Sequence, residues 1–448
     1  MRNRRLFALL ALLGALSLVA AACSNDDNAG SGGTGSATGG TSSTGGAVDC
    51  ESDQFGCVTV ASGEAFQLGT LLAISGDTAS LGQDSQNGVA LAIDYLDGTL
   101  DETNGQLLGH DVELVNEDDL CSAEGGQQGA TALSSNASIV AVIGTSCSSA
   151  ALGVADQILS DKGIVLLSPS NTNPGLTSQE AHQPFYSRTA HNDKIQGAIV
   201  SDFALQELGA TTAATINDES PYADGLAAAF RDNFEAGGGS ITAIEAIQSS
   251  DTDFKPLLTS IAEGNPDVLY FPDFNPACAL IASQAADIMP DTALIGSDGC
   301  LATDFLETAG DAATGVFASS PDLSVFANGD FYKNEFLPAY KTSFGTEPTA
   351  VFHAHAFDAA NILFDAIEAV AVDDGSGNLT IPRTALNDAL LGTSGYQGIT
   401  GTITCTPLGD CATDVTIGLF EAPGWPVEGG DPNAQAIFSE TKTLDDVL

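Results

Sequence analysis

A regular alternation of short apolar runs with amphipathic segments begins at Phe66, and this pattern limits the folds open to the chain. The amphipathic segment SQNGVALAIDYLDG places Val89, Ala90, Ile93 and Leu96 on one helical face. Short apolar runs separated by helices predict parallel strands, because right-handed crossovers return the chain to the same sheet. The first series consists of the predicted strands FQLGTLLAI, DVELVNED, SIVAVIG and GIVLLSP, with helices AEGGQQGATALS and SSAALGVADQILSDK between them.

A second series of the same kind follows FYSRTAHND, so we predict two α/β lobes with a cleft between them. Its predicted strands are TTAATIND, SITAIEAI, PDVLYFPD, TALIGSD and TGVFASS. Later, AVFHAHAFDAANILFDAIEAV predicts a long helix and GITGTITCTPLGDCATDVTIGLFE a hairpin, so the chain crosses between lobes more than once. The predicted boundaries are 66–190 and 322–391 for lobe 1, 191–321 and 392–425 for lobe 2, and 426–448 for a C-terminal tail.

The N-terminus has the features of an export signal. Three arginines precede an apolar segment from Leu6 to Ala22, which predicts a signal peptide over residues 1–22. The run Ala20–Cys23 resembles a bacterial lipoprotein cleavage site, which would make Cys23 the lipid-carrying N-terminus; the alternative is an ordinary signal beside an incidental cysteine. Residues 23–65 are rich in Gly, Ser and Thr, and we predict a flexible linker.

The charge balance argues against nucleic acid as a partner. The chain has 12 Lys and Arg against 59 Asp and Glu, and three arginines leave with the signal. Nine basic residues then face 59 acidic ones, a net charge of −50, which would repel a phosphate backbone.

Cysteine and histidine usage argues against a metal site and against an enzyme. Eight cysteines remain beside Cys23, and an even number in an exported chain favours disulfides; no Cys-x-x-Cys pair supports a structural zinc site. The five histidines have no metal-motif spacing, and the sequence contains no nucleophile elbow, dinucleotide fingerprint or phosphate loop. We therefore expect no catalysis, no metal and no cofactor.

Several motifs resemble the type I periplasmic binding proteins, and in particular the Leu/Ile/Val receptors of ABC importers. The resemblance runs from about Phe66 to Phe420. It implies a two-lobed fold of flavodoxin-like parallel sheets with helices on both faces and hinge crossovers. The motifs are LLAISGDTASLGQDSQNGVALAIDYL, VNEDDLCSAEGGQQGA, VIGTSCSSAALGVADQILSDKGIVLLSPSNTNPGLT, NDESPYADGLAAAFRDNF and LIGSDG.

The resemblance assigns the carboxylate of an amino-acid ligand to two loops of lobe 1. In GTSCSSAALGVADQIL, Ser148 would supply its hydroxyl and backbone N–H where a strand leads into a helix, whose N-terminus favours an anion. In SPSNTNPGLT, Ser170 would offer its carbonyl oxygen, and Thr172 its hydroxyl and N–H.

The resemblance assigns the ligand ammonium to lobe 2. Asp298 in IGSDG would be its anionic partner, and Tyr222 in ESPYADG would close over the ligand. The alternatives are a helix N-cap for Asp298 and a surface loop residue for Tyr222.

Three further residues would shape the side-chain pocket. Leu81 stands where the branched-chain pattern often has an aromatic residue, Phe274 where it has Tyr, and Phe352 matches an apolar wall. The amino acid that binds is therefore not specified.

The family pattern also implies that Cys121 pairs with Cys147, which would make Cys147 unavailable as a nucleophile. Proximity in the sequence suggests the three other pairs, which are Cys278 with Cys300, Cys405 with Cys411, and Cys50 with Cys57.

We therefore expect a monomeric, extracytoplasmic protein, lipid-anchored to the bacterial membrane, that binds a free amino acid and delivers it to ABC permease subunits. The alternatives are a sensor or a receptor for amides or urea, both with this fold.

Overall fold

A computed structural model describes residues 50–325, 329–431 and 433–447. The predicted signal peptide, Cys23 and most of the predicted linker lie outside the described residues. Within these ranges, no helix combines the length and apolarity that crossing a bilayer requires.

The first sheet confirms the predicted first series of parallel strands. It is parallel throughout, with the order β3-β2-β4-β5-β6. These strands are β2 (Phe66–Leu72), β3 (Val112–Asp118), β4 (Ile139–Gly144), β5 (Leu166–Ser168) and β6 (Tyr186–Arg188).

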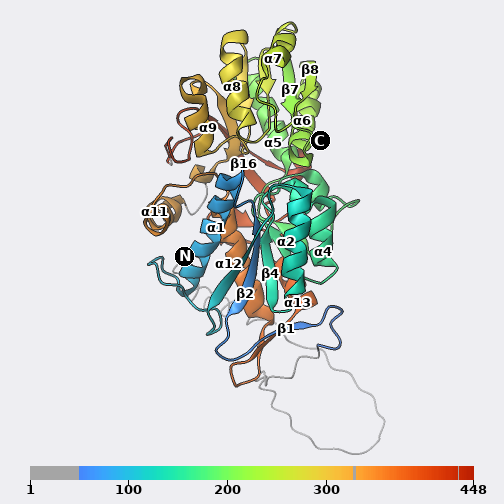
Figure 1. Ribbon diagram of the computed structural model, residues 1–448, viewed down its shortest axis with the longest axis vertical. Helices are drawn as coiled ribbons and strands as arrows, with labels where there is room; N and C mark the ends of the chain where they lie inside the picture. The colour runs from blue at the N-terminus through green and yellow to red at the C-terminus, as the bar shows by residue number, and fades with distance from the viewer. Residues whose placement is uncertain (1–49, 326–328, 432, 448) are drawn as a thin grey trace, which may run out of the picture. The chain divides into compact units, whose positions relative to one another are not determined.

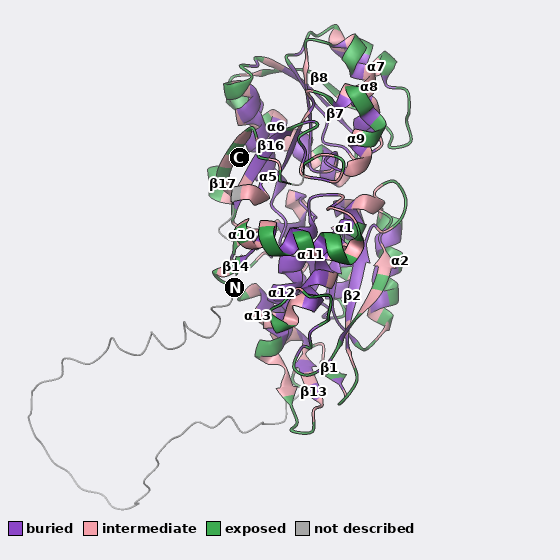
Figure 2. Cartoon of the chain, turned by 90° about the vertical axis from the view of Figure 1, so that its left-hand side faces the viewer, coloured by how far each residue is buried: buried purple, intermediate pink, exposed green. Residues whose placement is uncertain are grey.

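Helices cover both faces of this sheet because successive strand residues point to opposite sides. Leu68 and Ile143 pack with α1 (Ala79–Asp94) and α12 (His353–Val370), whereas Leu71 and Val142 pack with α2 (Ala123–Ser135) and α4 (Asp156–Ser160) (Figure 1). The long helix α12 is buried over most of its length, while α11 (Leu337–Phe344) exposes one side (Figure 2).

The second sheet contains the predicted second series and two added strands. Its order is β17-β16-β11-β10-β9-β7-β8, and the last five strands of this order are parallel. They are β7 (Thr212–Asn217), β8 (Ser240–Ala246), β9 (Val268–Tyr270), β10 (Ala293–Gly296) and β11 (Phe317–Pro321), with β16 (Asp414–Glu421) and β17 (Phe438–Thr443) antiparallel beside them.

Two further hydrophobic clusters show that helices also cover both faces of the second sheet. Val268 and Tyr270 pack with α5 (Asp193–Asp202) and α6 (Pro221–Ala236), and Leu269, between them in β9, packs on the opposite side. That side is covered by α7 (Lys255–Ala262), α8 (Ala277–Ile288) and α9 (Thr303–Ala309).

The remaining elements correct the predicted linker. Residues Cys57–Val60 form β1, which pairs with β13 (Leu379–Pro382) in a small antiparallel sheet, so the ordered chain begins before residue 66. The other short elements are β12 (Val372–Asp373), β14 (Tyr396–Gly398), β15 (Gly401–Ile403), α3 (Ser148–Ala150), α10 (Gly329–Phe331) and α13 (Arg383–Leu391).

The predicted hairpin around Cys405 and Cys411 is limited to its turn. There, Thr404 N–H donates to the carbonyl oxygen of Cys411 at 3.0 Å and Thr406 N–H to that of Asp410 at 2.7 Å, but the flanking strands do not pair with each other. Strand β15 pairs with β14, which precedes it, whereas β16 joins the second sheet between β11 and β17. The Asp358 carboxylate on α12 accepts hydrogen bonds from the N–H groups of Ile399 and Thr400, at 2.9 and 2.8 Å. The turn between β14 and β15 therefore belongs to lobe 1 and not to lobe 2 as predicted, and the predicted tail contains β17 of lobe 2.

All four predicted disulfides are present, and they link Cys50–Cys57, Cys121–Cys147, Cys278–Cys300 and Cys405–Cys411. A cysteine in a disulfide is not a nucleophile. We therefore expect a chain that starts at Ser24 to show no reactive thiol in denaturant without reductant, and eight after reduction. A colorimetric thiol titration measures both values, and a thiol reactive before reduction would contradict at least one pair.

Candidate functional site

Residues of both lobes line a cavity at the carboxyl ends of the strands, where ligands of open α/β sheets bind. The cavity has about 1400 Å³ of empty volume, part of it open to solvent. Lobe 1 contributes the loop at Ser75–Thr78, Leu120–Ala123 and Ser149, and lobe 2 contributes Asp218–Pro221 and Phe274–Ala277.

A smaller pocket, with about 270 Å³ of empty volume that includes space open to solvent, adjoins the larger cavity, and Asp77, Thr78, Phe274 and Asn275 line both. Three of the predicted ligand residues, Leu81, Phe274 and Asp298, line this smaller cavity.

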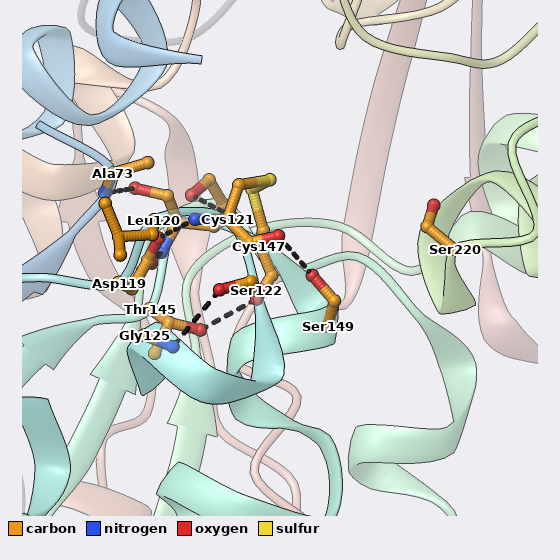
Figure 3. Close-up of a disulfide and its surroundings, with 12 residues drawn as sticks. Ala73, Asp119, Leu120, Cys121, Ser122, Gly125, Thr145, Cys147, Ser149 and Ser220 are labelled. Atoms are coloured by element: carbon orange, nitrogen blue, oxygen red, sulfur yellow. Dashed lines mark hydrogen bonds between the residues drawn. A yellow bond between two sulfur atoms is a disulfide. The ribbon is translucent and has the colours of Figure 1, made fainter. Parts of the chain in front are cut away.

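The loop Gly144–Ser149, which contains GTSCSS, is held by hydrogen bonds to the end of β3 (Figure 3). The Asp119 carboxylate accepts hydrogen bonds from the N–H groups of Ser146 at 2.6 Å and of Cys121 at 2.7 Å. The Ser149 hydroxyl donates to the carbonyl oxygen of Cys121 at 2.9 Å. Burial raises the pKa of Asp119 to about 7, and these N–H groups oppose the rise. These hydrogen bonds hold the loop in place, and Cys147 is not available as a nucleophile because it is in a disulfide.

The helix predicted after this loop is not continuous. Helix α3 has only three residues, and Leu152 and Gly153 leave the helical conformation, with Gly153 at a φ of +73°, before α4 begins. The macrodipole of a long helix is therefore not available at Ser148. The predicted donors to a ligand carboxylate are therefore the N–H and hydroxyl groups of the loop, without the end of a long helix behind them.

The second predicted loop lies directly against the first. The Ser170 hydroxyl donates to the carbonyl oxygen of Ser146 at 2.9 Å, and the N–H of Asn173 donates to the Ser148 hydroxyl at 3.4 Å. Ser148, Ser170 and Thr172 are all buried. The structure thus brings the three residues predicted to hold a carboxylate together in two adjoining loops.

Asp298 and Tyr222 are also in contact, and neither has the alternative role weighed from the sequence. Asp298 Oδ1 accepts hydrogen bonds from the Tyr222 hydroxyl at 3.0 Å and from Gln196 Nε2 at 2.7 Å. The N-cap of α9 is Ala302, so Asp298 does not cap that helix, and Tyr222 is buried rather than on a surface loop. The Tyr222 ring packs on Phe274 with 4.9 Å between ring centroids. Burial raises the pKa of Asp298 to about 6, and the bonds from Gln196 and Tyr222 oppose the rise.

Sequence reasoning missed Asp193, the first residue of α5. It is fully buried, its N–H donates to the carbonyl oxygen of Thr172 at 3.0 Å, and neither carboxylate oxygen has a hydrogen-bond partner among the described residues. Burial raises its pKa well above the usual range and the nearby Asp298 raises it further, whereas the Thr172 hydroxyl and the Arg188 guanidinium oppose the rise. In the sequence, an aspartate in the first turn of a helix is explained by the helix dipole alone, so the pattern gave no reason to single it out.

Phe352 lies behind the cavities and does not line either of them. Its ring stacks on His191, with 6.3 Å between centroids, and meets His355 edge to face at 5.3 Å. His191 Nε2 donates to Gln196, whose amide nitrogen donates to Asp298. Burial lowers the pKa of His191 to about 4, so this ring is neutral near pH 7. Phe352 therefore supports the side chains behind the site.

Buried carboxylates, among them Asp119 and Asp358 of lobe 1, make the free energy of unfolding depend on pH. Burial raises the pKa of Asp119 to about 7 and that of Asp358 to about 6, against roughly 3.9 in an unfolded chain. The folded state therefore keeps protons that the unfolded state releases, and this stability is present below about pH 4 and lost as pH rises through the folded pKa values.

We expect the unliganded protein to have a Tm several degrees higher at pH 5 than at pH 8, measured by scanning calorimetry. Asp358→Asn should reduce this difference because it removes one of the contributing groups. A Tm that increases from pH 5 to pH 8 would contradict the assignment.

Comparison with known proteins identifies the family of the chain. A family model described as "Periplasmic binding protein" matches residues 65–413. The Leu/Ile/Val-binding protein BraC3 of Rhizobium johnstonii is 29% identical over 308 residues, which cover 67% of this chain and 78% of that protein. The leucine-, isoleucine-, valine-, threonine- and alanine-binding protein of Pseudomonas aeruginosa is 26% identical over 295 residues, covering 66% and 76%.

Solved structures agree on the fold. The leucine binding protein LivK of Thermotoga maritima has a TM-score of 0.71 at 25% identity and covers 86% of this chain and 100% of that chain. A solute binding protein of an ABC transporter from R. palustris, solved with benzoate, has a TM-score of 0.68 at 22% identity and covers 83% and 97%.

Proposed function

Because the chain belongs to the periplasmic binding protein family, we propose that it is the substrate-binding component of an ABC importer and captures a free amino acid between its two lobes. The family consists of solute-binding proteins that work outside the cytoplasm. Such a protein binds its ligand and releases it unchanged, so affinity and not bond chemistry is its function.

The observation that carries the proposal is the pair of buried carboxylates, Asp193 and Asp298. Within the described ranges neither forms an ion pair, and Asp193 has no hydrogen-bond partner for its carboxylate oxygens. Isolated buried charges are costly unless a counter-charge accompanies them. A ligand ammonium bound by both carboxylates and the Tyr222 hydroxyl would supply that charge.

The ligand carboxylate would bind at the two adjoining loops of lobe 1. Ser148 and Thr172 carry the hydroxyls, and the N–H groups of the same loops supply further donors, as N–H-rich turns do for anions. Because Asp193 N–H donates to the carbonyl oxygen of Thr172, the carboxylate site and the ammonium site are directly connected. This connection matches an α-amino acid, in which one carbon separates the two groups.

The side chain of the ligand would occupy the smaller cavity between Leu81 and Phe274, with Phe352 behind it. The apolar part of its wall, which is formed by Leu81, Phe274, Ala302 and Ala350, supports a branched-chain or similar ligand. The relatives named as Leu/Ile/Val-binding proteins support the same class.

The second candidate is a sensor or a receptor for another small ligand on the same fold. The R. palustris protein solved with benzoate supports it, since benzoate has no ammonium. Amides and urea also lack the ammonium that the Asp193–Asp298 pair would bind, which makes an amino acid the better match.

We propose further that Cys23 carries a lipid that anchors the protein to the outer side of a bacterial membrane, and that the protein acts as a monomer with ABC permease subunits. The family assignment supports the extracytoplasmic location.

The test is calorimetric titration of a chain that starts at Ser24, unfolded and refolded to remove carried-over ligand. The panel holds branched, small, polar and acidic L-amino acids together with simple amides and urea. Saturable binding of one class of amino acids would support the proposal. Binding of an amide and of no amino acid would favour the second candidate. If no compound of the panel gives a heat of binding, both ligand classes are rejected.

A further inference from the structure

We propose that Asp119 is a positioning residue that fixes the loop Gly144–Ser149 in the form that binds the ligand carboxylate. The inference rests on the proposed function, in which Ser148 of this loop contacts that carboxylate. Asp119 does not line either cavity, so its effect would pass through the loop.

The Asp119 carboxylate joins its own loop to the loop after β4, and Ser146 of the second loop joins both to a third segment. Asp119 lies just after β3 and is fully buried; one of its oxygens accepts from Cys121 N–H on its own loop, and the other from Ser146 N–H in the loop after β4 (Figure 3). The hydroxyl of Ser146 in turn accepts from Ala73 N–H, beyond the end of β2, at 3.0 Å. Both carboxylate oxygens accept, so the ionised group, which predominates above about pH 7, connects the two loops at two points.

The hydrogen bonds to Asp119 do not involve Ser148, the residue of the loop that would contact the ligand carboxylate. Because Ser146 N–H points at Asp119, the peptide that precedes it is fixed in orientation, and the next residues of the loop are fixed with it. The Ser148 hydroxyl accepts only a long hydrogen bond, from Asn173 N–H at 3.4 Å, so its own proton remains able to donate. The disulfide Cys121–Cys147 closes the same unit covalently.

An asparagine at position 119 cannot reproduce this arrangement. Its amide has one acceptor oxygen, and its NH₂ group would face a backbone N–H that it cannot bond. One of the two donors, Cys121 N–H or Ser146 N–H, would then be buried without a partner, which favours displacement of the loop. A longer glutamate keeps two acceptor oxygens.

The experiment compares two probes, L-leucine and L-leucinamide, which differ at the carboxyl group and share the ammonium and the side chain. If the panel shows tighter binding of another amino acid, that acid and its α-carboxamide replace the pair. Calorimetry gives the ratio of the two Kd values for the wild type, Asp119→Asn and Asp119→Glu. The matched control is Asp358→Asn, which removes another fully buried carboxylate of lobe 1 that accepts two backbone N–H bonds but lines neither cavity.

We expect the wild type to prefer the free acid and Asp119→Asn to lose that preference by about tenfold, with little change in amide affinity. Asp119→Glu should recover part of the preference, and it keeps the test open if Asp119→Asn does not fold. Asp358→Asn should lower the Tm and keep the wild-type ratio.

A folded Asp119→Asn protein with the wild-type ratio would overturn the inference and reduce Asp119 to a structural residue. Tighter binding of the free acid by Asp119→Asn would also overturn the inference, since it would mean that Asp119 repels the ligand carboxylate. An equal loss of preference in Asp358→Asn would overturn it as well. If the wild type binds no amino acid at all, the proposed function itself has failed and the inference fails with it.

Discussion

The substitution Asp298→Asn is expected to raise the Kd for the amino-acid ligand by about 30- to 5,000-fold, which corresponds to about 2 to 5 kcal/mol. The reason is that the ligand ammonium would be buried beside a neutral amide instead of a carboxylate. The amide oxygen can still accept from Tyr222 and Gln196, which bond Asp298 in the structure, so the surrounding network should persist. Calorimetric titration gives the Kd, and circular dichroism verifies that the variant is folded.

The matched control for Asp298 is Asp224→Asn, an exposed acid on α6 whose replacement removes the same charge from the same lobe. Its Kd should stay within about twofold of the wild-type value because surface charges contribute little. Unchanged affinity in Asp298→Asn would remove this residue from the site.

The same residue gives the expected pH dependence of binding. Because burial raises the pKa of Asp298 to about 6 without ligand, and an ammonium favours the ionised carboxylate, binding must displace a proton below that pH. The contribution of Asp298 to affinity should therefore be constant above pH 7 and decrease by up to about tenfold per pH unit below pH 6. This decrease should be smaller in Asp298→Asn.

The substitution Asp193→Asn is expected to act in opposite directions on affinity and on stability. It should raise the Kd at least tenfold, because the ammonium loses one of its two anionic partners. It should also stabilise the unliganded protein by about 1 to 2 kcal/mol, because a buried carboxylate without partners, next to Asp298, becomes neutral. Calorimetric titration and thermal unfolding without ligand measure the two effects.

The control for Asp193 is Asp273→Asn. Asp273 is also fully buried with no hydrogen-bond partner for its carboxylate oxygens among the described residues, and burial raises its pKa well above the usual range. Its replacement should stabilise the protein and leave the Kd unchanged. If Asp193→Asn lowers both affinity and stability, the carboxylate has a structural role and the ammonium site is wrongly assigned.

The sequence by itself predicted the order of strands and helices in both lobes, the four cysteine pairs and the residues that the motifs carry. The order of strands and helices and three of the disulfides were predicted from short-range patterns, namely the periodicity of apolar residues and the proximity of cysteines. The Cys121–Cys147 pair and the site residues came from the resemblance to the family's motifs. Leu81, Phe274 and Asp298 could be found this way because each sits in a motif, and the structure gathers them around one cavity.

The tertiary structure decided the features that depend on contacts between distant segments. Local alternation predicted a hairpin across Cys405 and Cys411, but β16 pairs with β11 and β17 instead, and a strand pattern does not specify its partner. Helical periodicity continued through Gly153, where the backbone leaves the helix. Asp193 was hidden for the same reason: its importance comes from burial and from Asp298, 105 positions later, and no local pattern records either.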